Sequence, residues 1–194
     1  KDNPVRIIID SDPQLGPLGA WGGILVVDTN RESILRYTQV YGSGGAVLPY
    51  RQDSYGLTGC VTFYKTSVRI ENSSFNALQC EDGLNIISSK FIIDSSEFVD
   101  SSADAFDSDF SDGIVTNSVF RNIMNDGIDV SGSQVQVSSS RFIDIRDKAI
   151  SVGEGSRLDA SELTIVRSDA GVVSKDKSVV NIRNSSFKEV NNAL

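Results

Sequence analysis

The chain has 194 residues, of which 39% are apolar, so a single domain with a sizeable core is the simplest organisation. With 18 Lys and Arg against 26 Asp and Glu, the net charge of −8 excludes a nucleic-acid partner, which needs a cationic surface. The absence of histidine excludes Ser-His-Asp and Cys-His triads, histidine-ligated zinc and a histidine general base. Acid–base chemistry would fall to Asp, Glu, Lys, Arg or Tyr.

The first part of the chain is the least regular. It begins without Met and has neither a signal-peptide core nor an apolar run near the roughly 18 residues of a membrane span, so we expect a mature or excised soluble segment. Apolar runs predict single strands over residues 5–10, 23–28 and 33–41, the less regular first coils of residues 1–41. Residues 42–58, rich in Gly and polar side chains, predict a loop insertion that projects from an early coil.

A repeat of about 22 residues dominates the regular coils predicted for residues 59–194. Similar five-residue segments begin at Glu81, Ala103, Asn125 and Asp147. One apolar column comprises Phe75, Phe98, Phe120, Phe142, Leu163 and Phe187, and a second pairs Val68/Ile70 with Phe91/Ile93, Val135/Val137 and Val180/Ile182. The apolar residues alternate, and Ser/Asn corners precede the aromatic residues. We therefore predict an all-β solenoid with three short strands per coil and an internal Phe ladder spaced at about 4.8 Å.

The two cysteines have a spacing that matches neither a CxxC motif nor a zinc ribbon. Cys60 and Cys80 fall about one coil apart. A disulfide between neighbouring coils and two buried thiols both remain open.

Acidic residues recur in two rows of the repeat. If Phe106 and Ile128 point into the core, alternation turns the residues that follow them outward. The outward row then contains Asn85, Asp107, Asp129 and Ser151, with Asp109 two residues further along, and a second row at the preceding turn contains Asp82, Asp104, Asp126 and Lys148. Together they predict one acidic face.

Carboxylates about 5 Å apart repel by roughly 1 kcal/mol in water and by more near a protein surface, so something must offset the repulsion. The candidates are a bound cation such as Ca²⁺, proton sharing, and hydrogen bonds from turn amides. Turn amides are the simpler explanation for the second row. The predicted metal ligands are Asp107, Asp109, Asp129, Asp104 and Asp126.

Basic and aromatic residues supply further candidates. Arg121 and Arg141 lie on the coils of the acidic stack, where they would bind a substrate carboxylate or make ordinary surface ion pairs. Aromatic rings with a polar edge suit a sugar surface, although they would equally seal the end of a solenoid. The predicted carbohydrate-binding residues are Tyr50, Tyr55, Arg51 and Trp21.

The segment Asn125-Asp126-Gly127-Ile128-Asp129, its upstream echoes, the Ser/Asn corners and the Phe ladder resemble right-handed parallel β-helix proteins of the pectin lyase-like superfamily. The likeness covers roughly residues 23–194 and is greatest to bacterial secreted and surface β-helix repeat proteins, many without an assigned activity. Polygalacturonases of this superfamily carry an Asn-x-Asp-Gly motif, an Asp-Asp pair and a Gly-His-Gly motif. Only the first has a partial echo here, at Asn125-Asp126-Gly127, which argues against that activity.

The resemblance and the acidic rows together predict an extracellular module, secreted or on the cell surface, that binds or processes an acidic polysaccharide, with Ca²⁺ as its cofactor. The first alternative is a structural or adhesive spacer of a surface protein with further coils or domains. The second is a lyase or epimerase acting on uronic acids, which is favoured over a glycoside hydrolase. Its catalytic candidates are Asp107, Asp129, Arg121 and Arg141.

Overall fold

The computed structural model describes the backbone of residues 5–8, 22–43, 48–50 and 55–194, and the side chains of residues 22–43 and 58–194. All regular structure in these residues is β-strand. The strands are β1 Val5–Ile8, β2 Ile24–Val27, β3 Ser33–Arg36, β4 Thr38–Tyr41, β5 Leu48–Tyr50, β6 Tyr55–Leu57, β7 Gly59–Tyr64, β8 Val68–Glu71, β9 Ser74–Asn76, β10 Asp82–Ile87, β11 Lys90–Asp94, β12 Glu97–Val99, β13 Asp104–Asp109, β14 Asp112–Thr116, β15 Val119–Ile123, β16 Ile128–Ser131, β17 Gln134–Ser138, β18 Arg141–Gly153, β19 Arg157–Ser161, β20 Thr164–Ser174, β21 Val179–Arg183 and β22 Ser186–Asn192. In the described part of the chain, no helix has the length and apolarity needed to cross a membrane.

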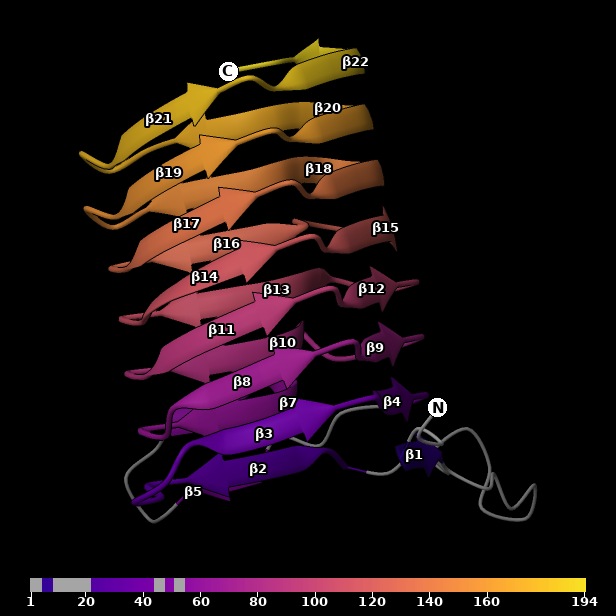
Figure 1. The fold of residues 1–194 in the computed structure, drawn as a ribbon, viewed down its shortest axis with the longest axis vertical. Helices are drawn as coiled ribbons and strands as arrows, with labels where there is room; N and C mark the ends of the chain where they lie inside the picture. The colour runs from indigo at the N-terminus through magenta and orange to yellow at the C-terminus, as the bar shows by residue number, and fades with distance from the viewer. Residues whose placement is uncertain (1–4, 9–21, 44–47, 51–54) are drawn as a thin grey trace.

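The strands wind into a solenoid of three-stranded coils. Equivalent strands of successive coils pair in parallel and stack along the long axis of the molecule (Figure 1). From Thr66 onward, corner residues that bond from coil to coil are 22 or 23 residues apart. The predicted fold class, coil length and number of strands per coil are confirmed.

Three faces run the length of the solenoid. The first contains β2, β7, β10, β13, β16 and the ends of β18 and β20. The second contains β3, β8, β11, β14, β17, β19 and β21. The third contains β1, β4, β9, β12, β15, the starts of β18 and β20, and β22. Strands β18 and β20 each run without a break from the third face into the first. These two faces therefore form one 13-stranded sheet.

The Phe ladder lies inside the third face. Neighbouring rings stack in parallel, with centroid distances of 4.8 Å from Phe120 to Phe98 and to Phe142. The prediction that Leu163 continues this column is wrong, because Ile165 pairs with Phe142. This coil has one extra residue, so Leu163 falls at the corner, where its N–H donates to Ser185 Oγ at 3.1 Å.

Serine ladders hold two of the corners. In each ladder the backbone N–H of one coil donates to the side-chain oxygen of the serine in the next coil. One ladder connects Thr38, Ser73, Ser96, Ser118 and Ser140, and the other connects Thr66, Ser89, Ser111, Ser133, Ser156 and Ser178. The residue before a corner serine has a left-handed φ, for example 48° at Asn72 and 52° at Asn117. Asn tolerates this conformation better than most residues, which explains the Ser/Asn corners of the sequence.

The first coils depart from the prediction at one place. The expected single strand over residues 33–41 is wrong, because Tyr37 has a left-handed φ of 51° and separates β3 from β4. The expected strands over residues 5–10 and 23–28 correspond to β1 and β2. Within the predicted insertion, β5 and β6 form an antiparallel pair.

A disulfide joins two neighbouring coils. Cys60 in β7 and Cys80 before β10 are bonded, with Cα atoms 5.5 Å apart. We expect its reduction to lower the free energy of unfolding by about 3 kcal/mol, because the cross-link restricts the unfolded chain. Urea unfolding with and without dithiothreitol measures the difference. The Cys60→Ala/Cys80→Ala variant is the control and should not respond to dithiothreitol; equal stability of the oxidised and reduced wild type would contradict the prediction.

Candidate functional site

The two acidic rows lie on the outside of the first face, as predicted. The register pairs Asn85 with Asp107, Asp107 with Asp129, and Asp129 with Ser151. We call these four residues the polar column. Phe106 and Ile128 beside it point inward and are fully buried, so the alternation deduced from the sequence is confirmed.

In the second row, at the turn, backbone amides hold two of the aspartates. Asp104 Oδ1 accepts a hydrogen bond from the Asp126 N–H at 2.7 Å, and Asp126 Oδ1 accepts one from the Lys148 N–H at 3.0 Å. Burial nevertheless raises the pKa of Asp126 to about 6. These contacts favour the turn-amide explanation for Asp104 and Asp126.

Asp82, at the start of this row, has different partners. Its Oδ2 accepts hydrogen bonds from Thr58 Oγ1 at 2.8 Å and from Asn85 Nδ2 at 3.4 Å. The residue is only 4% exposed, and burial raises the pKa of Asp82 to about 7. Asp82 is therefore attached to the polar column and does not cap a turn.

The polar column is partly to fully buried although it lies on the outer side of a sheet, and Asp107 and Asp129 in its middle are half-buried. Asn85 is 3% exposed and Ser151 is fully buried. One oxygen of every member lacks a hydrogen-bond partner: Asn85 Oδ1, Asp107 Oδ1, Asp129 Oδ1 and Ser151 Oγ. An unsatisfied buried polar atom costs about 1–3 kcal/mol, so four in a row are expensive for the fold alone.

Asn85 connects the carboxyl groups around it. Its Nδ2 lies 3.2 Å from Asp107 Oδ2 and 3.1 Å from Asp109 Oδ2, in addition to its contact with Asp82. Its two N–H groups cannot satisfy three carboxyls fully at the same time. The sequence predicts no role for Asn85 beyond its place in the row, although an amide at the head of a row of acids is a signal for such a contact.

Proton binding is strongly favoured at Asp107. Burial, followed by the charges of Asp109, Asp82, Asp129 and Asp104, raises the pKa of Asp107 to about 9. Burial also raises the pKa of Asp109. Without a bound cation, Asp107 is therefore expected to carry a proton at neutral pH, and a pKa perturbed in this way is common at functional sites.

The column fits a hard cation in its chemistry. All the unsatisfied atoms are oxygens, which Ca²⁺ and Mg²⁺ prefer, and a cation would offset the repulsion between carboxylates. Within the described residues no three Asp, Glu, His or Cys side chains gather as a metal-binding group, and Asp104 and Asp126 are engaged at turns. A cation held by Asp107, Asp109 and Asp129 would therefore take further ligands from water or a bound molecule. The calcium site stays a prediction.

The other candidate residues are not brought to the column. Arg121 in β15 and Arg141 at the start of β18 are exposed on the third face, whereas Asp107 and Asp129 belong to the first. The basic group next to the acidic rows is instead Lys148, which pairs with Asp147 and, at 3.4 Å, with Asp126.

The predicted carbohydrate-binding residues fall in the first, less regular part of the chain. Trp21 and Arg51 lie outside the described residues. Tyr50 and Tyr55 are paired across the β5–β6 hairpin, and only their backbone is described. Their role stays a prediction.

The fold and the outer rows define a parallel β-solenoid with a polar column on one face. The family model described as the right-handed beta helix region matches residues 22–193, and the chain belongs to this family. No curated protein matches the chain. The family description specifies a fold and no reaction, so function must be argued from the site.

Proposed function

We propose that the chain is an extracellular module that binds an acidic polysaccharide through a divalent cation held by the polar column. The observation that carries this proposal is the set of four buried oxygens without hydrogen-bond partners on consecutive coils. Folding alone gains nothing from leaving them unsatisfied, whereas a bound cation would use them as ligands.

The arrangement along the axis supports a polymer as the ligand. Neighbouring members of the column belong to paired strands, so the oxygens repeat at the inter-strand spacing of about 4.8 Å. The carboxylates of a uronic-acid polymer would complete the ligand shell of the cation, since the described protein side chains supply too few acids to do so. Without a cation, the net charge of −8 would repel such a polymer.

The test combines thermal unfolding with binding to polygalacturonate and alginate. We expect millimolar Ca²⁺ to raise the unfolding midpoint relative to EDTA, because a ligand that binds only the folded state stabilises it. The double variant Asp107→Asn/Asp129→Asn should lose both the shift and the calcium-dependent binding. Asp94→Asn on the second face is the control and should keep both. Absence of a calcium shift in the wild type would contradict the proposal and favour a structural or adhesive spacer.

The lyase or epimerase alternative has less support. Such an enzyme needs a basic group beside the cation, whereas Arg121 and Arg141 lie on another face and Lys148 is engaged with Asp126 and Asp147. Release of unsaturated uronates from either polymer, measured by absorbance, would restore this alternative.

A further inference from the structure

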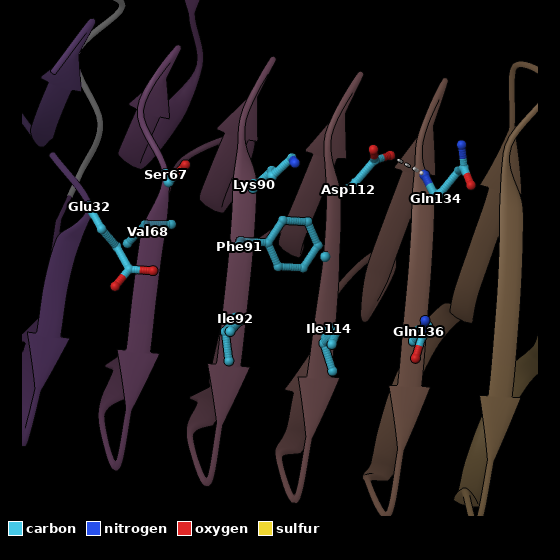
Figure 2. A pocket seen from close by; sticks show the side chains of 11 residues that line it. Glu32, Ser67, Val68, Lys90, Phe91, Ile92, Asp112, Ile114, Gln134 and Gln136 are labelled. Atoms are coloured by element: carbon cyan, nitrogen blue, oxygen red, sulfur yellow. Dashed lines mark hydrogen bonds between the residues drawn. The ribbon is translucent and has the colours of Figure 1, made fainter. Parts of the chain in front are cut away.

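A second surface, on the second face of the solenoid, has the character of a binding groove. It has a volume of about 520 Å³ and crosses successive coils along the axis. Lys90, Asp112 and Gln134 follow one another along one row of the groove, and Ile92, Ile114 and Gln136 along another (Figure 2). The groove thus offers an apolar strip beside a strip of hydrogen-bonding groups.

The fold does not require the apolar strip. The register continues this outer row through Arg69, Ile92, Ile114, Gln136 and Asp159, so the same structural position accepts polar and charged residues in other coils. Ile114 is 37% exposed, and Ile34 at the start of the row is 54% exposed. Apolar side chains here gain little from burial in the folded chain.

Phe110 is a stronger anomaly at the edge of this face. It lies at the corner between β13 and β14, with a left-handed φ of 49° that bulky residues rarely adopt, and it is 64% exposed. Ser88 and Gly132 have the same left-handed conformation at corners of the adjoining coils. A Cβ at Gly132 would lie 2.6 Å from the Phe110 ring, so the glycine leaves room for the ring above it. The corner tolerates Phe110 without gaining core burial from it.

The ring and the groove belong to one continuous surface. A neighbouring hollow of about 460 Å³ includes Phe110 and shares Ser67, Lys90 and Asp112 with the groove. Lys90 makes no ion pair or side-chain hydrogen bond with any described residue. Asp112 Oδ1 accepts a hydrogen bond from the Gln134 N–H at 3.1 Å (Figure 2).

Charge selects the class of ligand. Across the two hollows, the lining residues Lys65 and Lys90 equal Glu32 and Asp112 in number, and Glu32 is also paired with Arg69 at 3.3 Å, so the surface has no concentration of charge of one sign. The remainder of this acidic chain repels anions. An extended molecule with apolar ring faces and many hydroxyl groups, and without charge, matches the exposed ring, the isoleucines and the amide side chains.

We propose that this groove, with the Phe110 ring at its edge, binds an extended neutral polysaccharide. The site lies on a different face from the polar column and needs no cation. A test of this site therefore does not depend on the calcium-dependent site.

Affinity electrophoresis tests this site in gels that contain hydroxyethylcellulose, xyloglucan, galactomannan or dextran, all with EDTA. We expect at least one of these neutral polymers to retard the wild type. Phe110→Ala should weaken that binding about tenfold through loss of the stacking surface, and Ile114→Ser should weaken it too. Phe110→Tyr should bind like the wild type because it keeps the ring.

Two controls make the result specific. Val179→Ala removes an apolar residue that is 50% exposed on the same face but outside the groove, and it should bind normally. Asp107→Asn/Asp129→Asn should also bind normally, which separates this site from the calcium-dependent one. Thermal unfolding should give equal midpoints for Phe110→Ala and wild type.

Three results would overturn the proposal. The first is that none of the four polymers retards the wild type, and the second is that Phe110→Ala binds as well as the wild type does. The third is that the wild type sediments as a dimer and Phe110→Ala as a monomer, while neither binds a polymer. The last result would assign the surface to self-association.

Discussion

We expect Phe120→Ala to lower the free energy of unfolding by about 3–5 kcal/mol. Phe120 is fully buried, and its ring stacks at 4.8 Å on both Phe98 and Phe142. Removing the ring deletes both stacking contacts and leaves a cavity that close-packed neighbours fill only in part. Urea unfolding followed by circular dichroism measures the loss.

Two substitutions of the same chemistry serve as controls. Phe187→Ala alters the last member of the column, which is only half-buried, and should be less destabilising. Phe110→Ala alters an exposed ring and should change stability by less than about 0.5 kcal/mol. Equal losses at Phe120 and Phe110 would show that the ladder does not hold the coils together.

We expect Asp107→Asn to raise the free energy of unfolding at pH 8 by about 1–3 kcal/mol in the presence of EDTA. The pKa of Asp107 is raised to about 9 in the folded chain, from an ordinary value of 3.8. Between these two values the folded state binds more protons than the unfolded state, so stability falls as the pH rises. The raised pKa values of Asp82, about 7, and Asp126, about 6, act in the same direction.

The wild type should therefore have a higher unfolding midpoint at pH 5 than at pH 8, and Asp107→Asn should reduce this difference. Asp94→Asn is the matched control. Thr116 and Asn117 donate hydrogen bonds to Asp94 and lower its pKa, so its charged form is stabilised and its substitution should slightly reduce stability at pH 8. A wild-type midpoint that rises from pH 5 to pH 8 would contradict the assigned protonation of Asp107.

The sequence predicts the rows of the solenoid well because coil length and alternation fix which residues stack. The pairing of Asp107 with Asp129, and the inward direction of Phe106, follow from those two rules alone. The rule fails where a coil gains a residue: Leu163 and Ile165 are both apolar, and only the backbone register shows which one joins the ladder.

The burial of side chains and their contacts across coils are harder to predict from residue types. Nothing in the sequence indicates that Asn85 would be 3% exposed on an outward position, nor that its amide would contact Asp82, Asp107 and Asp109. The disulfide likewise depends on a Cα separation of 5.5 Å, which spacing along the chain leaves open. The sequence does not predict the groove on the second face, because its lining residues come from separate coils and share no motif.

The serine ladders also bear on how such a chain can change length during evolution. Within each ladder a corner hydroxyl accepts from the coil before it, and the backbone N–H of the same residue donates to the coil after it, as at Ser96 and Ser118. Duplication or deletion of one complete coil would leave the bonding pattern intact at every junction. A single extra residue is absorbed within a coil, as between Phe142 and Ile165, whereas the longer insertion in the 35-residue separation between Thr38 and Ser73 falls between two corners. The hydroxyl ladders therefore favour changes in chain length by whole coils.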